Sequence, residues 1–123
     1  MYQINGDKLG GMQSRPLKRI DILRHELKAL RFILDHYHSG ELPSALLPPR
    51  DDFQSEQGRE IYSAIVEAPD RVAAEQRIHG FELDEVDIES FLRLTGEHYH
   101  TYLALVRERA GAIRRGELKV EAA

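Results

Sequence analysis

The chain has 123 residues and a formal net charge of −4, from 17 basic and 21 acidic side chains. This length suits one domain and excludes large catalytic folds such as the (β/α)8 barrel, which needs about 250 residues. The acidic balance gives no overall attraction to nucleic acid, and the absence of cysteine excludes disulfides, zinc ribbons and thiol catalysis. No apolar run is long enough for a signal peptide or a bilayer span, so we expect a cytoplasmic protein.

The predicted elements begin after a polar, glycine-containing lead-in over residues 1–16. Apolar side chains then recur at steps of three and four over residues 17–38, which predicts an amphipathic helix that ends at Ser39-Gly40. Residues 41–50 hold three prolines and read as a packed connector, with room for one helical turn after Pro43.

Four further helices are predicted from apolar periodicity and from capping residues, which accept hydrogen bonds from the first free amides of a helix. With their expected N-caps they are 55–68 (Ser55), 71–79 (Asp70), 85–94 (Asp84) and 97–115. Only Thr95-Gly96 separates the last two, so they are expected to form a helical hairpin. We therefore predict one all-α domain over 17–115, a compact bundle of five or six helices ending in that hairpin, and a frayed tail over 116–123.

Catalytic and metal-binding signals are weak in this sequence. The histidines include two His-Tyr-His triplets, at 36–38 and 98–100, but side chains two positions apart on a helix point about 200° apart and cannot share one ion. The acidic clusters lie near predicted helix starts, where capping explains them better than catalysis. The sequence holds neither a GxSxG nucleophile motif nor a phosphate-binding loop. We predict no enzyme activity, no metal and no cofactor.

Two features of the last predicted helix each have two interpretations. Its basic side chains suit either nucleic-acid contact or the negative end of the helix dipole; they are Arg107, Arg109, Arg114 and Arg115. Its apolar and aromatic side chains cover more than one narrow stripe. That surplus suits either a partner surface or the closing of the bundle's own core.

Four sequence blocks occur in a fixed order along the chain. They are Glu26-Leu27-Lys28-Ala29-Leu30, Leu47-Pro48-Pro49-Arg50-Asp51-Asp52-Phe53, Arg59-Glu60-Ile61-Tyr62-Ser63-Ala64-Ile65 and Tyr99-His100-Thr101-Tyr102-Leu103-Ala104-Leu105-Val106-Arg107-Glu108-Arg109. This order resembles the N-terminal domain of the DnaB-type replicative helicase, and it is similar to the helicase-binding C-terminal domain of DnaG-type primases. The stretch between the third and fourth blocks is shorter than in the helicase domain, which brings the chain closer to the primase version.

The resemblance implies a non-catalytic protein–protein interaction domain of DNA replication. In the helicases this domain dimerises, builds a collar and receives primase; in primases the related domain docks on that collar. It therefore implies a homodimer and a replicative helicase or primase as partner. By resemblance, the contact surface comprises Phe91, Leu94, Tyr99, Tyr102, Leu103, Val106 and Ile113, and the fold-defining residues are Asp52, Phe53, Arg59, Ile61, Tyr62 and Ile65. The alternative is a small helical DNA-binding or regulatory protein that uses the four arginines of the last helix.

Overall fold

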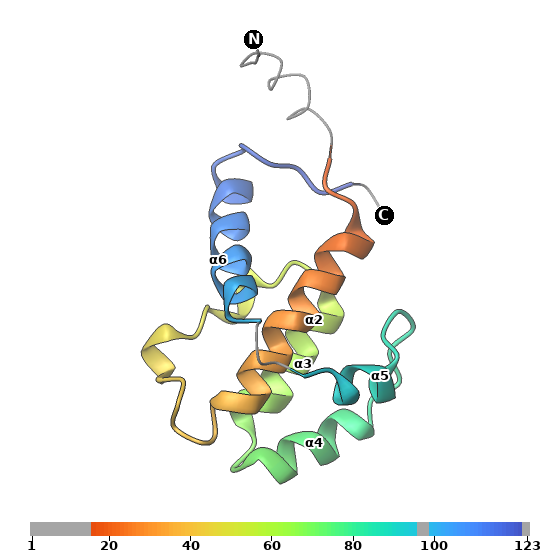
Figure 1. Cartoon of the computed structure of the whole chain (residues 1–123). Coiled ribbons are helices and arrows are strands. Elements are labelled where there is room, and N and C mark those ends of the chain that lie inside the picture. The colour runs from red at the N-terminus through yellow and green to blue at the C-terminus, as the bar shows by residue number, and fades with distance from the viewer. Residues whose placement is uncertain (1–15, 96–98, 122–123) are drawn as a thin grey trace.

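The computed structural model describes residues 16–95 and 99–121 (Figure 1). Within them the chain forms five α-helices and two short 3₁₀ helices, and its only extended pairing is an isolated bridge between Leu17 and Val120. In chain order the elements are α2 (Arg19–His36), η1 (Ser44–Leu46), η2 (Arg50–Asp52), α3 (Glu56–Glu67), α4 (Arg71–His79), α5 (Ile88–Arg93) and α6 (His100–Arg114). The predicted all-α bundle is confirmed. The predicted lead-in lies, apart from Pro16, outside the described residues.

Helix α2 is the central element of the bundle, since every other described α-helix packs against it. The α6 helix runs along one side of α2, while α4 and α5 pack near its C-terminal half (Figure 1). The predicted hairpin is wrong, because α5 packs on α4 and α2, whereas α6 packs on α2 and η2. The backbone becomes extended at Leu94 (φ −62°, ψ 147°), so α6 begins on the opposite side of α2 instead of folding back on α5.

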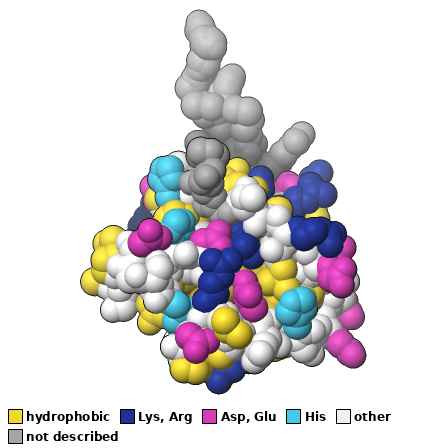
Figure 2. Space-filling view, turned by 60° about the horizontal axis from the view of Figure 1, so that its bottom comes forward, with side chains coloured by type: hydrophobic (Ala, Val, Ile, Leu, Met, Phe, Trp, Pro, Cys, Tyr) yellow, Lys and Arg dark blue, Asp and Glu magenta, His cyan; other side chains and the backbone are white. Residues whose placement is uncertain are grey.

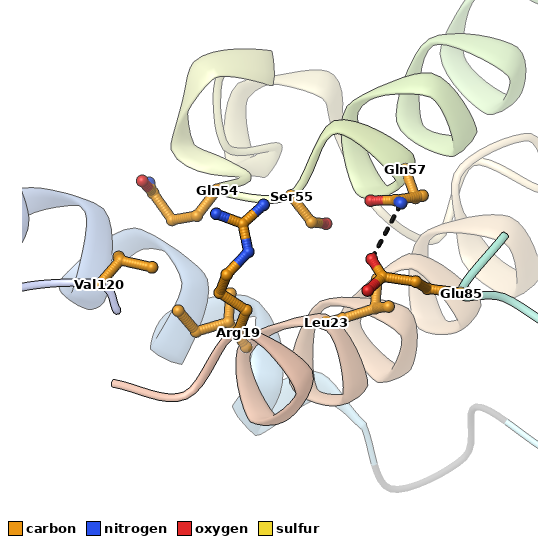
Figure 3. Close-up of a pocket in the computed structure, with 8 residues that line it drawn as sticks. Arg19, Leu23, Gln54, Ser55, Gln57, Glu85 and Val120 are labelled. Carbon is orange, nitrogen blue, oxygen red and sulfur yellow. Dashed lines mark hydrogen bonds between the residues drawn. The ribbon is translucent and has the colours of Figure 1, made fainter. Parts of the chain in front are cut away.

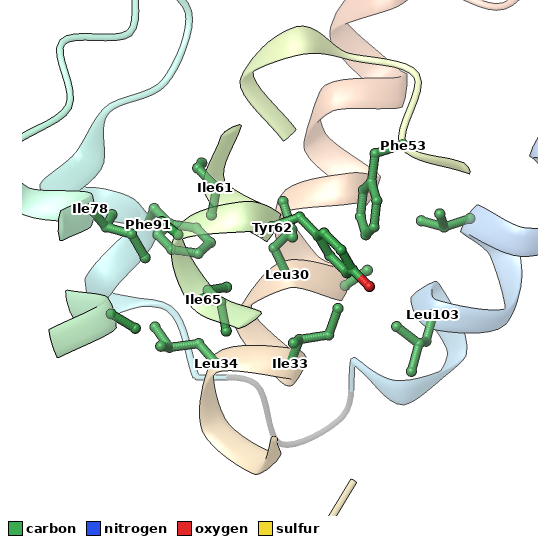
Figure 4. Packing of buried hydrophobic residues seen from close by; sticks show 14 of the residues in the cluster. Leu30, Ile33, Leu34, Phe53, Ile61, Tyr62, Ile65, Ile78, Phe91 and Leu103 are labelled. Atoms are coloured by element: carbon green, nitrogen blue, oxygen red, sulfur yellow. The ribbon is translucent and has the colours of Figure 1, made fainter. Parts of the chain in front are cut away.

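The hydrophobic core lies mainly between α2 and α3 (Figure 4). Leu30, Ile33 and Leu34 of α2 are fully buried, as are Ile61 and Ile65 of α3. Burying such side chains contributes about 1.5–3 kcal/mol each, so this contact supplies much of the stability.

The expected fold-defining residues build the wall of this core next to η2. Phe53 is fully buried and its ring lies 5.0 Å from the ring of Tyr62, whose hydroxyl donates a 2.6 Å hydrogen bond to Pro48 O. Arg59 Nη1 donates to Phe53 O at 2.8 Å and fixes the extended residue before α3. Asp52 is also buried, so these positions all serve packing as expected.

Local side-chain caps set most helix starts. Ser55 Oγ accepts from Gly58 N at 3.0 Å and Asp70 Oδ1 accepts from Ala73 N at 2.8 Å, which confirms both predicted caps. The predicted start of α5 is wrong, because Asp87 and not Asp84 is its N-cap. Asp87 accepts from both the amide and the hydroxyl of Ser90, at 3.2 and 2.8 Å, and so starts the helix three residues later than expected.

The C-terminal segment is fixed to the start of α2. Leu17 N donates to Lys119 O at 2.7 Å, and Glu121 N donates to Leu17 O at 2.9 Å. Glu121 Oε1 accepts from Arg19 N at 2.8 Å and so caps the first turn of α2, which has no cap from Lys18. The predicted frayed tail is therefore wrong for residues 116–121.

A buried carboxylate joins α2 to the start of α3. Glu26 is 1% exposed; its Oε2 accepts from Gln54 N at 2.5 Å, and its Oε1 accepts from Ser55 N at 3.1 Å and Ser55 Oγ at 2.5 Å. Burial raises the pKa of Glu26, whereas these three donors and the charge of Arg109 lower it. The carboxylate also faces the positive end of the α3 dipole, so it acts as a cap supplied by another helix.

Gly58 is required by this close approach. A Cβ atom at position 58 would lie 2.6 Å from Ser55 Oγ and 2.8 Å from Glu26 Oε1, and neither oxygen can move without losing its hydrogen bonds. A residue with a side chain would therefore push α3 away from α2 at its first turn.

We expect Gly58→Ala to lower the free energy of unfolding by about 1–3 kcal/mol, because overpacking outweighs the gain in helix propensity. Gly80→Ala is the matched control. A Cβ at position 80 meets only backbone atoms at 3.4 Å or beyond, so this variant should stay within about 1 kcal/mol of wild type. Urea unfolding measures the free energy of unfolding of both variants. Equal stability of the two would contradict the proposed role of Gly58.

Candidate protein-binding surface at the α2–α6 seam

The residues expected to form the contact surface divide into two groups. Phe91, Leu103 and Val106 are buried, at 2%, 9% and 1% exposure, and belong to the core. Their predicted place in an interface is wrong, because Phe91 of α5 and the apolar stripe of α6 both help to close the bundle's own core. The other four stay partly accessible; they are Leu94, Tyr99, Tyr102 and Ile113.

Tyr99 and Tyr102 belong to a row of half-buried rings where α2 meets the start of α6. Tyr102 lies 5.8 Å from Tyr99, edge to face, and 5.4 Å from the imidazole of His25. Lys28 Nζ lies 5.0 Å from the centre of the Tyr102 ring and 5.7 Å from that of Tyr99, within range of a cation–π interaction. The two helices therefore present a cation held against two tyrosine rings.

Phe32 extends this row toward the C-terminal end of α2. Its ring lies 4.4 Å from that of His36 and 6.3 Å from that of His100 at the start of α6. His36 Nδ1 in turn lies 2.6 Å from Glu41 Oε1. We name the resulting surface the aromatic seam and define it by His25, Lys28, Phe32, His36, Tyr99, His100 and Tyr102.

The aromatic seam lies above a second buried charge, that of Arg109. This side chain is 8% exposed, and its Nη2 donates to His25 Nδ1 at 2.9 Å. Because Nδ1 accepts, the proton of neutral His25 is assigned to Nε2. Desolvation lowers the pKa of Arg109, whereas the carboxylates of Glu26 and Asp21 raise it. The charges of Glu26 and Arg109 thus attract one another, although burial outweighs this attraction and leaves the pKa of Glu26 raised and that of Arg109 lowered. His25 connects Arg109 to Tyr102 at the surface.

The four arginines of α6 and its C-terminal end do not form one basic strip. Arg109 is buried, Arg114 Nη1 lies 2.9 Å from Asp52 Oδ1, and Arg115 donates twice to Glu117, at 3.0 and 2.9 Å. Arg107 is exposed. Arg109 is therefore unable to offer its charge to a nucleic acid at the surface, whereas the alternative nucleic-acid contact through Arg107, Arg114 and Arg115, which stay exposed, remains a prediction.

Acidic side chains serve structural roles here as well. Asp35 lies 3.1 Å from Arg31 and 2.9 Å from Arg71, and Arg31 also donates to Leu92 O at 3.0 Å. This cluster ties α2 to α4 and α5, and basic and acidic side chains lie intermixed near the middle of the face that carries α4 (Figure 2).

Within the described ranges, no three histidine, aspartate or glutamate side chains are grouped so that they could hold a metal ion.

A small pocket lies between the first turn of α2 and the start of α3 (Figure 3). Arg19 extends into it beside Gln54 and Ser55, and Gln57 Nε2 donates to Glu85 Oε1 at 3.1 Å on its far side. Its volume of about 30 Å³ suits one or two water molecules and not a metabolite. The α2–α6 seam therefore remains the better candidate for recognition.

Sequence reasoning missed the buried charges that support the seam. Glu26 occurs in the apolar stripe of α2, three residues after Leu23 and four before Leu30, and Arg109 occurs three residues after Val106 in the buried stripe of α6. A charged residue at an apolar position of a helix signals a buried pair. Both residues carried that signal.

No protein family model, no curated protein and no solved structure matches this chain. Among the described residues, no helix combines the length and the apolar character that a membrane span requires.

We expect the fold to become less stable as the pH falls, because His25 then takes up a proton. Burial and the charges of Arg109 and Lys28 lower its pKa below 6.5, although Asp21 opposes them. As the pH falls below about 6.5, the unfolded chain takes up this proton before the folded chain does. The folded state therefore loses the stability that neutral His25 contributes above that pH.

Urea unfolding between pH 8 and pH 5 measures this loss. In His25→Asn the amide oxygen takes the place of Nδ1 as acceptor for Arg109 but does not titrate, so this variant should lose less stability below about pH 6.5 than wild type. His79→Gln, at an exposed position of α4, is the control and should follow wild type. Identical pH profiles for all three proteins would exclude His25 as the titrating group.

Proposed function

We propose that this chain is a non-catalytic protein-interaction domain of DNA replication that docks on a replicative helicase or a primase. The aromatic seam is the observation that carries the proposal. The class of partner comes from the resemblance, whose second and third blocks supply Phe53, Ile61 and Tyr62 to the core.

The chemistry of the seam suits a protein partner. Tyrosine and other aromatic side chains are enriched in interfaces because they bury a large area and have few rotatable bonds. Here each ring already contacts a neighbour, and Tyr102 is held between His25 and Tyr99. Less conformational entropy is then lost on binding, which favours affinity.

Lys28 defines what the partner should offer. Its ammonium group lies against two tyrosine rings and not in an ion pair that any described residue supplies. A partner segment with apolar side chains and a carboxylate would cover the rings and pair with this charge. Partial desolvation of the contact would strengthen that pair.

The buried charges have a supporting role in this proposal. The carboxylate of Glu26 accepts three hydrogen bonds and has 1% exposure, so it has no access to a substrate. Arg109 holds His25 in place beneath the rings. Arg109 therefore positions the seam directly, and Glu26 supports it through its charge.

Titration calorimetry with the replicative helicase and the primase of the same cell tests this function. We expect one of them to bind, and Tyr102→Ala and Lys28→Glu each to weaken binding about tenfold or more, as at interface hot spots. Val72→Ala and Lys119→Glu remove an exposed apolar and an exposed basic side chain elsewhere and should leave affinity unchanged.

Circular dichroism verifies that each variant keeps its helices. If wild type binds neither protein, or if the seam variants bind as tightly as the controls, the proposed function is wrong.

A further inference from the structure

The aromatic seam continues along α6 beyond Tyr102. Leu105, Arg109 and Ala112 follow Tyr102 at steps of three and four residues, so these four side chains share one side of the helix. Leu105, Arg109 and Ala112 line a groove of about 590 Å³, and Arg109 also donates to His25 of the seam. The seam and the groove therefore form one surface. We name it the α2–α6 trough and define it by the aromatic seam together with Leu17, Leu105, Arg109, Ala112 and Leu118.

The groove end of the trough has apolar walls. Leu17, Leu105 and Leu118 line it, and all three are half-buried. The hydrogen bond from Leu17 N to Lys119 O, 2.7 Å long, fixes Leu17 and the C-terminal segment beside one another. Ala112 also lines the groove, and its short side chain lets another helix approach closely at this point. This end therefore offers leucines for a partner to cover and room for its backbone.

The shape of the trough suits a third helix. The α2 and α6 helices run antiparallel, since His25 lies beside Tyr102 and Phe32 lies near His100 (Figure 1). From His100 to Ala112 the α6 helix rises about 18 Å, which is more than three turns. An extended peptide would find no backbone partners here, because both helices bond their own amides and carbonyls. A helix satisfies its own backbone groups, and its apolar stripe fits a groove between two helices.

Basic side chains predominate along the trough. The charged residues that line the groove are Arg107, Arg109 and Arg115 together with one acid, Glu108. Lys28 adds a further positive charge at the seam end, where it lies against the tyrosine rings. The chain as a whole has a net charge of −4, so this local excess is opposite in sign to the charge of the whole protein. A partner segment rich in carboxylates would therefore be attracted to the trough.

The acids nearby do not occupy these positive charges fully. Glu117 accepts from Nε and Nη2 of Arg115, at 3.0 and 2.9 Å, so this contact does not use Nη1. The two side chains are 61% and 59% exposed, and ion pairs at such exposure hold their partners weakly. Asp21, on the α2 side, lies 3.9 Å from Arg24. A partner carboxylate can therefore bind Arg115 without displacing Glu117.

We propose that the α2–α6 trough binds an acidic amphipathic helix of the partner protein, more than three turns long. The apolar row of this helix covers Tyr102, Leu105 and Ala112, and its carboxylates face Lys28 at one end and Arg115 at the other. This binding mode rests on the proposed function, because the aromatic seam is one half of the trough. It adds the shape, the length and the charge of the segment that binds.

Other occupants match the trough less well. A second copy would bring the same basic excess against itself, and residues 1–15 carry two basic side chains and one acid. The phosphates of a nucleic acid would meet Glu108, Leu105 and Leu118 as well as the arginines. An acidic amphipathic helix meets both the leucines and the positive charges with complementary groups.

Fluorescence anisotropy with the whole chain tests this binding mode on labelled model peptides of about 16 residues. All carry the same row of leucines at steps of three and four. The first has glutamates beside the row, the second has lysines there, and the third is the first with a proline at its centre. We expect the acidic peptide to bind with a dissociation constant below about 100 µM, and about tenfold or more tightly than the other two. The lysines are repelled by the trough, and the proline breaks the helix.

Variants of this chain locate the contact. Leu105→Glu and Arg115→Glu should each weaken binding of the acidic peptide about tenfold, because each adds a carboxylate to the trough. Leu46→Glu and Arg77→Glu are the matched controls. They make the same exchanges at exposed positions of η1 and α4 and should leave the affinity unchanged. Circular dichroism verifies the helices; if Leu105→Glu does not fold, Arg115→Glu decides alone.

An acidic peptide that does not bind at about 1 mM overturns the proposal. Equal binding of the acidic and basic peptides, or affinity that neither trough variant changes, overturns it as well. If the proline peptide binds as tightly as its parent, the helical mode is wrong. A single-stranded oligonucleotide that binds the trough more tightly than the acidic peptide would assign the surface to nucleic acid instead.

Failure of this binding mode and failure of the proposed function give different results. If helicase or primase binding responds to Tyr102→Ala but not to Leu105→Glu or Arg115→Glu, the helix in the trough is wrong and the proposed function stands. If the acidic peptide binds through the trough but neither helicase nor primase binds, the class of partner is wrong and the binding mode stands.

Discussion

The carboxylate of Glu26 is the constraint on which this bundle depends. An ionised group buried in a protein interior costs several kcal/mol unless hydrogen bonds and an opposite charge compensate it. Gln54 and Ser55 supply the hydrogen bonds, and Arg109 supplies the opposite charge from α6. Because these groups come from three separate parts of the chain, the compensation exists only when α3 and α6 both pack correctly on α2. The buried charge therefore favours one arrangement of the helices over others that would bury the same apolar area.

The arrangement of the aromatic seam depends on these buried charges. Arg109 holds His25 through Nδ1, and His25 lies against Tyr102, which in turn lies against Tyr99 and Lys28. Arg109 thus holds, from inside the bundle, the rings that are proposed to contact a partner. The position of Arg109 in turn depends on the buried carboxylate of Glu26. A docking domain benefits from such an arrangement, since side chains that are already ordered lose little freedom on binding.

Much of the fold could be predicted from sequence because helices and caps are local. Periodicity located α2, α3 and α4 closely, and Ser55 and Asp70 cap helices through amides three residues away. Asp84 was mistaken for the cap of α5 because both it and Asp87 are acidic, and only the position of Ser90 distinguishes them. Long-range relations could not be predicted. The packing of α6, the pairing of the tail with Leu17 and the burial of Arg109 each join residues far apart in sequence, and periodicity carries no information about such distances.

Amide hydrogen exchange, followed residue by residue, tests the role of Glu26 most directly. Gln54 and Ser55 lie before α3, where free amides normally exchange fast, yet each donates to the buried carboxylate. We expect their amides to exchange as slowly as those of Leu30 and Ile33 in the core, through global unfolding. Exchange at the rate of the exposed amide of Ala45 would contradict the view that this carboxylate fixes the helices in place.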